Sequence, residues 1–187
     1  MIIREKDYLK KRKRKYLLAS LMWLVIMFAI FLLGYMTTKT RGNIYTVLAA
    51  ILVLPVAQYS TQLFVILRFK DPDPETSKQL ESIKGKYSLF HSALIPDEKR
   101  ILYFDHIFVT GSKIYCIMEN PKDINDTKRI LNKKLKAKGI SLNKVVYIEK
   151  EKTKDLGNLF KKIEKDAIIE REEDLKEYTQ LIAQMMM

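Results

Sequence analysis

Residues 16–36 read YLLASLMWLVIMFAIFLLGYM and residues 43–67 read NIYTVLAAILVLPVAQYSTQLFVIL, and these two runs decide the fold. Neither run contains an Asp, Glu, Lys, Arg or His residue. A bilayer core is about 30 Å thick and a helix rises about 1.5 Å per residue, so about 20 apolar residues are enough to cross it. The sequence therefore predicts a transmembrane helical hairpin over residues 16–68, with helices at about 16–36 and 43–67. The alternative is a buried hairpin in a soluble protein, but the rest of the chain is too small and too charged to enclose two such helices.

Basic residues are concentrated before the first apolar run. The formal net charge is +12, and residues 1–42 supply ten basic and two acidic side chains of that balance. The connection between the runs carries only Lys39 and Arg41. Cytoplasmic segments next to membrane helices are rich in Lys and Arg, so we expect a multi-pass protein of the cell membrane with both termini cytoplasmic. Residues 1–15 are then a basic cytoplasmic tail, which serves as a topology signal or binds anionic lipid or nucleic acid.

The second apolar run is less uniform than the first. Pro55 removes a backbone donor in mid-helix, so we expect a kink there. Gln58 and Gln62 lie one turn apart on one face, where amides bond to another helix or line a polar path. Neither run has an ionisable group, so a proton or ion relay would lack its usual carriers. We therefore favour helix association over a conduit.

The part of the chain after the hairpin has the pattern of a small α/β domain. Residues 69–74 (FKDPDP) form a linker, and the domain covers residues 75–153. Asp73 reads as a helix N-cap with Pro74 at the first helical position. Runs of β-branched and aromatic residues bounded by Pro, Gly and Ser predict strands. The expected order is αβββαβ, with helices at 75–84 and 124–138 and strands at 87–95, 101–110, 114–120 and 144–149.

Residues 154–187 predict a C-terminal helix. Leu175, Tyr178, Ile182 and Met185 recur at intervals of three and four, as in a coiled-coil seam. A four-stranded sheet already covered by two helices leaves no obvious room for this stripe. We therefore expect the first half of the helix to pack on the domain, and the second half to project from it and to mediate self-association or the binding of another protein, because exposed apolar stripes find partners.

A family resemblance rests on residues 87–121, which read YSLFHSALIPDEKRILYFDHIFVTGSKIYCIMENP. This stretch resembles the core of the nuclease-related domain (NERD) and of the wider restriction-endonuclease-like fold. The closest correspondence is FDHIFV at 104–109, which is similar to the aspartate-bearing strand of that family. The resemblance implies that Asp105 and a following glutamate hold a divalent metal, and that a lysine two residues later orients the attacking water.

The catalytic motif of that family is incomplete here. The family's spacing, counted from Asp105, places Met118 at the glutamate position and Asn120 at the lysine position. A shift by one residue makes Glu119 the acid, but Pro121 then takes the lysine position and the strand face is inverted. Lys122 lies beyond the strand. The candidate catalytic residues of a nuclease are therefore Asp105, Glu119 and Lys122, with Asp105 and Glu119 as metal ligands, and no complete site.

The remaining residues exclude several other classes of site. One cysteine and two histidines exclude an intramolecular disulfide framework and a zinc cluster of the usual spacing. The single cysteine, Cys116, lies in an apolar strand, where a packed thiol is expected. The sequence contains no glycine-rich phosphate loop and no H-E-x-x-H or G-x-S-x-G motif.

The favoured reading is a membrane-anchored adaptor or regulatory protein without catalytic activity or cofactor, whose cytoplasmic domain has a degenerate nuclease-like fold. A membrane-anchored nuclease using Mg²⁺ or Mn²⁺ is one alternative. A small oligomeric membrane component of a transport system, built on Gln58 and Gln62, is another. The expected partners are membrane lipid and a protein or second copy bound through the C-terminal helix, whereas no motif supports nucleic acid.

Overall fold

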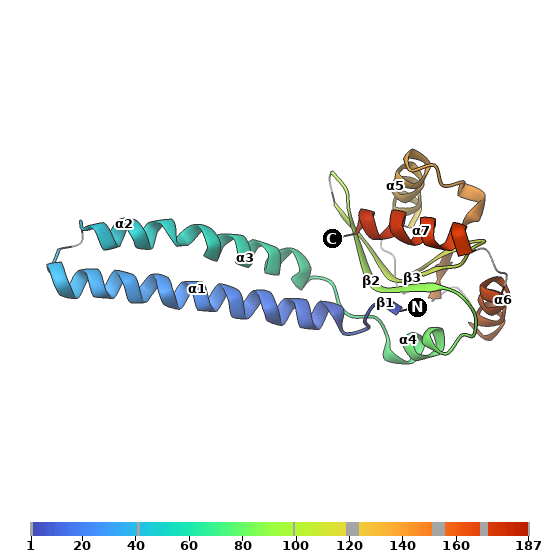
Figure 1. Cartoon of the computed structure of the whole chain (residues 1–187), viewed down its shortest axis with the longest axis horizontal. Coiled ribbons are helices and arrows are strands. Elements are labelled where there is room, and N and C mark those ends of the chain that lie inside the picture. The colour runs from blue at the N-terminus through green and yellow to red at the C-terminus, as the bar shows by residue number, and fades with distance from the viewer. Residues whose placement is uncertain are drawn as a thin grey trace. The chain divides into compact units, whose positions relative to one another are not determined.

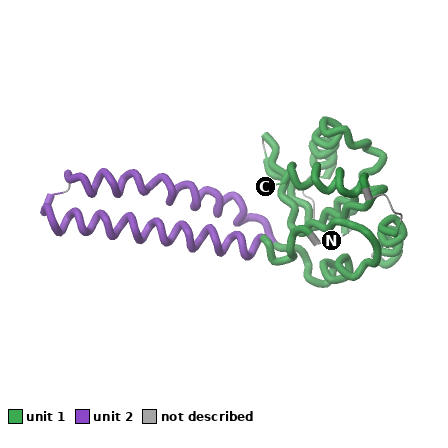
Figure 2. The backbone as a smooth tube through the Cα atoms, viewed as in Figure 1, with its two compact units in different colours: residues 1–8, 71–187 green, residues 9–70 purple. Residues whose placement is uncertain are grey.

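The computed structural model describes residues 2–40, 42–98, 100–118, 124–150, 156–168 and 172–186. It contains two compact units (Figures 1 and 2). One unit is the continuous segment Leu9–Lys70. The other unit comprises Met1–Tyr8 and Asp71–Met187, which precede and follow the first unit in the sequence.

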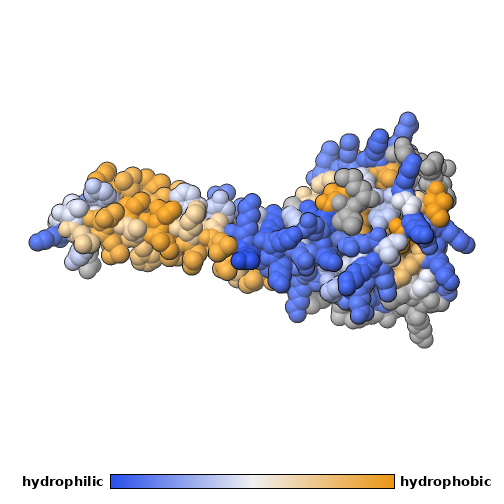
Figure 3. Space-filling view, turned by 60° about the horizontal axis from the view of Figure 1, so that its bottom comes forward, coloured by the Kyte–Doolittle hydropathy of each residue, from blue (hydrophilic) through white to orange (hydrophobic). Residues whose placement is uncertain are grey.

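The segment Leu9–Lys70 is a helical hairpin. It consists of α1 (Tyr8–Thr38), α2 (Ile44–Ile51) and α3 (Val53–Leu67). Tyr8–Thr38 and Ile44–Leu67 are both long and apolar enough to cross a membrane, and only 6 % of the most apolar window of each is buried within the chain. Apolar side chains therefore cover the surface of the hairpin, as Figure 3 shows in orange. A core helix of a soluble protein would bury these side chains.

The helix boundaries differ from the predicted ones at two places. The first helix starts at Tyr8 instead of residue 16, so most of the basic segment is helical and not an extended tail. Lys and Arg are good helix formers, and the apolar helix that follows continues through them. The second helix is interrupted at Leu52, which lies three residues before Pro55. This is the predicted irregularity, because a proline ring clashes with the carbonyl four residues earlier, here that of Ile51.

The turn of the hairpin is held by Asn43. Its side-chain oxygen accepts a hydrogen bond from Thr46 N (2.9 Å), and its amide donates to the Gly34 carbonyl (3.1 Å). Gly34 allows this close approach, because a Cβ there would lie 2.4 Å from the Tyr45 Cβ. Nearer the other end of the hairpin, the hydroxyl groups of Ser20 and Ser60 lie 2.8 Å apart. Small and hydroxyl side chains thus join the two helices, as is usual between membrane helices.

The second unit is built on a five-stranded mixed sheet in the order β1-β2-β3-β4-β5. The two edge strands pair in parallel with their neighbours, and the three central strands are antiparallel. Strands β4 and β5 are parallel and are connected through helix α5 (Ile124–Ala137), as the predicted crossover requires. The strands are β1 (Ile2–Arg4), β2 (Ser88–Pro96), β3 (Ile101–Val109), β4 (Ile114–Met118) and β5 (Val145–Glu149).

Strand β1 is a correction to the prediction that residues 1–15 form a tail. Ile2 pairs with Leu89 and Arg4 with Phe90. Residues 2–4 (IIR) contain too few apolar residues to be recognised as a strand, and the basic run that follows masks them. The sheet is therefore one strand wider than the predicted one.

Two helices cover each face of the sheet (Figure 1). On one face, α5 (Ile124–Ala137) and α7 (Glu172–Met185) pack on strand residues such as Phe104 and Ile107. On the other face, α4 (Pro74–Glu81) and α6 (Leu156–Ile168) pack on residues such as Phe108 and Tyr115. A short 3-10 helix, η1 (Leu142–Lys144), leads into β5. The predicted order αβββαβ is confirmed as a general layout.

Helix α6 packs on the domain as expected of the first half of the C-terminal segment, but α7 overturns the expectation that the second half projects. Tyr178 is 7 % exposed and Ile182 is 0 % exposed, and both belong to the core on the α5 face. Leu175 is half-buried against the same core. Helix α7 lies over the central strands β2 and β3, so this face of the sheet accommodates it together with α5. The apolar stripe is therefore core and not an exposed surface.

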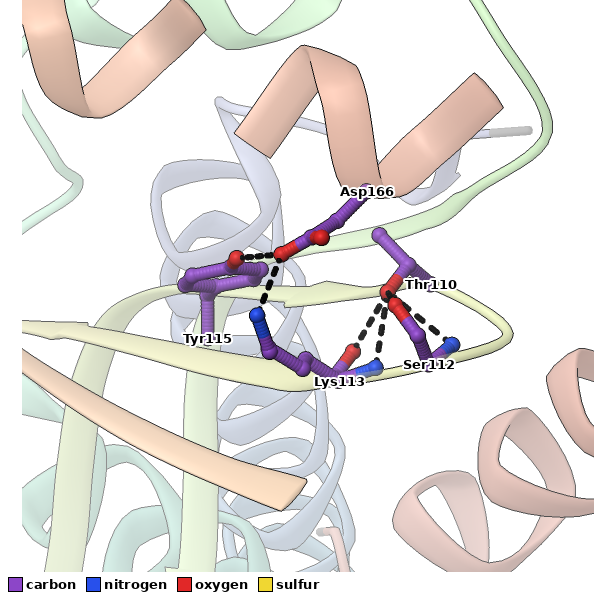
Figure 4. Close-up of polar contacts among 5 residues, drawn as sticks. All are labelled: Thr110, Ser112, Lys113, Tyr115 and Asp166. Atoms are coloured by element: carbon purple, nitrogen blue, oxygen red, sulfur yellow. Dashed lines mark hydrogen bonds and ion pairs between the residues drawn. The ribbon is translucent and has the colours of Figure 1, made fainter. Parts of the chain in front are cut away.

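Helix α6 is fixed to the opposite face by Asp166 (Figure 4). Its carboxylate lies 2.9 Å from Lys113 Nζ and accepts a hydrogen bond from the Tyr115 hydroxyl. Burial opposes ionisation of Asp166, but the bonds from Tyr115 and Lys113 outweigh it and lower the pKa of the carboxyl. The same turn between β3 and β4 is held by the Thr110 hydroxyl, which accepts from Lys113 N at 2.9 Å. The predicted turn at residues 110–113 is confirmed.

Candidate functional site

In the central strands β2 and β3, the alternation of side chains between the two faces of the sheet is interrupted at the same point. We call this interruption the phase change. Phe90 and Ala93 both lie in the core of the α5 face, although they are three residues apart. On β3, Phe104 and Ile107 are likewise three apart on that face. Residues of one strand face are normally separated by an even number. The backbone reason is Ser92, which has a φ of 51°, and a non-glycine residue in this region often marks a functional site.

The phase change brings the only two histidines of the sequence together. His91 and His106 are directly opposite in the register of β2 and β3. Their Nδ1 atoms lie 2.8 Å apart, and both side chains are almost fully buried. On the other side of the first ring, His91 Nε2 faces Glu81 Oε1 at 3.3 Å. The chain of contacts thus runs from a carboxylate at the end of α4 through two imidazoles.

This arrangement sets the tautomers of the two rings. A carboxylate only accepts, so we assign the proton of His91 to Nε2, and its Nδ1 then accepts from the Nδ1–H group of His106. Burial lowers the pKa of His106 to about 3, assisted by His91 and Lys150. Burial also lowers the pKa of His91, against the opposing effect of Glu81. Both rings are therefore neutral at neutral pH.

A carboxylate–lysine pair lies beside the histidines. Asp73 caps α4, because its carboxylate accepts from the backbone nitrogen (3.1 Å) and the hydroxyl (2.7 Å) of Thr76. Lys150, which follows β5, lies 3.0 Å from the same carboxylate. The Thr76 hydroxyl and the Lys150 ammonium hold the pKa of Asp73 well below its usual range. Sequence residues that lie 77 positions apart thus meet at one corner of the sheet.

Asp105 lines the same small cavity as Asp73, His106 and Lys150. Its side chain is 8 % exposed. Burial, followed by the charge of Asp105 and a hydrogen bond to it, raises the pKa of Tyr103, which lies two residues earlier on β3. The cavity has a volume of about 10 Å³, which is close to the smallest space that holds one water molecule. No substrate-sized group fits beside Asp105 in this conformation.

Of the three predicted nuclease residues, the structure describes Asp105. Asp105 lies in the cavity, whereas Glu119 and Lys122, like Asn120 and Pro121, lie outside the described residues. Met118 is 2 % exposed and packs in the core of the α5 face, so the residue at the family's glutamate position is apolar core. Among the described residues, no group of three or more His, Cys, Asp or Glu side chains is arranged to hold a metal ion.

The other residues that the sequence analysis singled out are Cys116 and the two glutamines of the second apolar run, Gln58 and Gln62. Cys116 is buried in the core, and burial raises the pKa of its thiol to about 12, so it is an inert packed thiol as expected. Gln58 is exposed on the hairpin and Gln62 is half-buried, and their role stays a prediction. Sequence analysis missed His91, His106 and Lys150. Their only signal is that each is a polar residue within or directly after a strand with a high content of apolar residues.

A second cavity lies between strand β1 and helix α7. It is an open groove with a volume of about 570 Å³, within the range of ligand-binding pockets. On one wall, the Thr179 hydroxyl donates to the Ser88 hydroxyl at 2.8 Å. The nine described residues that line this groove are Ile3, Gly85, Lys86, Tyr87, Ser88, Leu175, Lys176, Thr179 and Gln180.

The resemblance of residues 87–121 to the nuclease-related domain stays a prediction from the sequence pattern. Comparisons with protein-family models, with curated proteins and with solved structures give no match for this chain.

Proposed function

We propose that this chain is a membrane-anchored adaptor without catalytic activity, whose α/β unit binds a partner protein at the cytoplasmic face of the cell membrane. Two features support the anchoring. The hairpin helices expose apolar side chains along their length, which a bilayer would cover. Eight basic residues precede residue 16, against two in the connection, which favours cytoplasmic positions for both ends of the hairpin.

The contrast between the two cavities carries the adaptor proposal. The cavity with acids, histidines and a lysine has room for about one water molecule. The groove beside β1 is large enough for a ligand, but none of its nine described lining residues is an acid or a histidine. Metal binding uses such side chains, and general acid–base chemistry uses them most often. The groove beside β1 is therefore suited to binding a partner, whereas the polar cluster around the small cavity is suited to stabilising the fold.

The groove indicates the chemistry of the partner. Ile3, Tyr87 and Leu175 provide apolar contact area, and Lys86 and Lys176 provide positive charge. Ser88, Thr179 and Gln180 add hydroxyl and amide groups. A partner segment with an apolar anchor flanked by a carboxylate fits this combination, since interfaces pair a desolvated anchor with complementary charges.

The test is photo-crosslinking of the full-length chain in native membranes. A photoreactive amino acid at Gln180, which is exposed and lines the groove, is compared with one at Lys133, which is exposed on α5. We expect a discrete protein adduct only from position 180, weakened by Leu175→Asp and unchanged by Asp105→Asn. Equal adducts from both positions, or loss of the adduct in Asp105→Asn, would overturn the adaptor proposal.

One observation favours a second candidate, a metal-dependent nuclease. Lys150 and Asp105 line the same cavity, although the lysine comes from the end of β5 and not from the strand that the family motif uses. Lys150 is thus placed to orient a water molecule if Asp105 shares a metal ion with a further acid. The full-length chain is incubated with DNA and Mg²⁺ or Mn²⁺. Cleavage that is lost in both Asp105→Ala and Lys150→Met would replace the adaptor proposal with this one.

A further inference from the structure

Helix α3 carries two glutamines, Gln58 and Gln62, that lie one turn apart within the second apolar run. Gln58 is exposed and Gln62 is half-buried. The hydroxyl groups between them, those of Ser60 and Thr61, are both hydrogen-bonded within the hairpin. In contrast, neither glutamine amide forms a hydrogen bond with any residue that the structure describes. Gln58 therefore presents its amide to whatever surrounds the hairpin.

Gln58 lies close to the middle of the second membrane segment. At about 1.5 Å per residue, it is about 21 Å after Ile44 and about 14 Å before Leu67, the two ends of that segment. In a hydrocarbon core about 30 Å thick and centred on the segment, the amide then lies about 11 Å from the nearer boundary. Water is absent at this depth and acyl chains offer neither donors nor acceptors. An amide at this place therefore requires a protein partner.

The surface around Gln58 has the spacing of a helix-packing seam. Successive intervals of four, three and four residues connect Leu54, Gln58, Thr61 and Val65, which we call the Gln58 seam. Successive helix residues are rotated by about 100°, so these four side chains lie within an arc of about 60°. Leu54 is 71 % exposed, Gln58 and Thr61 are exposed, and Val65 is half-buried. Small side chains such as that of Thr61 let two membrane helices approach closely.

The Gln58 seam is complementary to itself. Copies of the chain that insert in the same orientation have parallel α3 helices, so a two-fold axis along the membrane normal places each seam residue opposite its own counterpart. An amide carries two donors and an acceptor, so two Gln58 side chains are able to bond to each other. The geometry points to a second copy of this chain as the occupant of the seam, with the two Gln58 amides hydrogen-bonded at the centre of a parallel contact between α3 helices.

This inference requires that the hairpin is embedded in a bilayer, but it does not depend on partner binding by the α/β unit. One hydrogen bond between membrane helices strengthens their association about threefold to thirtyfold. Since the symmetric contact contains two such bonds, Gln58→Leu should weaken the dimer about tenfold or more. Leucine has a similar size and a high helix propensity, and Gln58 is exposed, so the hairpin itself should stay folded.

The experiment measures energy transfer between two fluorescently labelled pools of the full-length chain in phosphatidylcholine vesicles, over a series of protein-to-lipid ratios. The dyes are attached to a cysteine that replaces Lys133, which is exposed on α5. We expect a saturable monomer–dimer curve that shifts to about tenfold higher protein density in Gln58→Leu. Gln58→Asn keeps the amide and should associate more tightly than Gln58→Leu. Gln62→Leu is the matched control, because it removes the other amide one turn away, and it should leave the curve unchanged.

Disulfide crosslinking in native membranes locates the contact on the helix surface. Leu54→Cys should give a covalent dimer of the chain on mild oxidation. Phe64→Cys should not, because Phe64 is 79 % exposed but lies about 90° from the middle of the Gln58 seam. Energy transfer no greater than random mixing gives, equal shifts in Gln58→Leu and Gln62→Leu, or equal crosslinking from positions 54 and 64 would each overturn the proposal. Crosslinking of position 54 to a different protein, and not to a second copy, would also overturn it.

Discussion

His91 and His106 face each other across strands β2 and β3, with their Nδ1 atoms 2.8 Å apart and almost no access to solvent. One imidazole donates a proton to the other, so the pair is satisfied only while at least one Nδ1 atom is unprotonated. Protonation of both rings would set two N–H donors against each other. The pair therefore makes the stability of the α/β unit depend on pH.

We expect the free energy of unfolding to fall as the pH is lowered below about 6.5. In the folded state the pKa values of both histidines are lowered, that of His106 from 6.5 to about 3. Between these pH values the unfolded chain binds more protons than the folded chain, which costs about 1.4 kcal/mol per pH unit for His106, and the lowered pKa of His91 acts in the same direction. Calorimetric unfolding of the detergent-solubilised chain between pH 7.5 and pH 4 measures the slope. A His91→Leu, His106→Leu variant should show a flatter slope, and an unchanged slope would contradict this assignment.

Single and double replacements of the pair should not be additive. His106→Leu leaves His91 Nδ1 buried without a donor, which costs about 1–3 kcal/mol. The additional change His91→Leu removes that stranded acceptor, so we expect the double variant to lose less stability than the sum of the two single variants. Chemical unfolding at pH 7.5 of the unmodified chain, the two single variants and the double variant gives the four free energies that the comparison needs. Additive losses would mean that the two rings do not share a hydrogen bond.

Replacement of Gly85 by alanine should destabilise the α/β unit strongly. Gly85 has a φ of 129°, and a Cβ there would lie 2.6 Å from the Ala167 carbonyl oxygen, where α6 meets the loop. Strain and overpacking together cost about 3 kcal/mol. Gly139→Ala is the matched control, because its φ is 82° but a Cβ would meet no atom within 4 Å, so it should lose only about 1 kcal/mol. Equal losses in the two variants would contradict the close approach of α6.

The pairing of the hairpin helices can be tested by a disulfide. The Ser20 and Ser60 hydroxyls are 2.8 Å apart, so the double variant Ser20→Cys, Ser60→Cys should crosslink on mild oxidation. Ser20→Cys with Thr61→Cys is the control, because Thr61 is exposed and its hydroxyl bonds within its own helix to Ala57 O. The native Cys116 stays silent because it is buried with a raised pKa. Equal crosslinking of both pairs would argue for another packing of the helices.

The topology predicts which cysteines an impermeant reagent reaches from outside intact cells. Thr38 is exposed at the end of α1 next to the hairpin turn, and Lys133 is exposed on α5. We expect Thr38→Cys to be labelled from outside and Lys133→Cys only after the membrane is opened, since the basic residues favour cytoplasmic ends. Labelling of position 133 alone in intact cells would invert the orientation and remove the cytoplasmic site from the adaptor proposal.

The elements that sequence analysis predicted well are those with a strong local pattern. The two apolar runs, the cap at Asp73 and the turn at residues 110–113 each depend on neighbouring residues, and all three are present. The order αβββαβ followed from runs of β-branched and aromatic residues. Such local signals are sufficient to place elements along a chain.

The errors concern what only tertiary contacts decide. The stripe of α7 has the spacing of a coiled-coil seam, but Tyr178 and Ile182 fill the core of their own domain. The histidine pair joins residues 15 positions apart through a simultaneous phase change in two strands, and Asp73 meets Lys150 across 77 positions. No local pattern encodes such meetings, and the width of the sheet depended on a strand of three residues. The local sequence patterns therefore predicted the helices and strands, but they did not predict which polar residues meet in the cluster.

Strand β1 sets an order of events during synthesis. Ile2–Arg4 is translated before the hairpin, yet its pairing partner β2 (Ser88–Pro96) is made only after the whole hairpin has been translated. Because β1 and β2 are separated by the hairpin in the sequence, the edge of the sheet that β1 forms is completed only after both apolar helices have been made. A bulky fusion placed directly before Ile2 would compete with that late docking step. A tag at the opposite end of the chain leaves the returning strand unobstructed.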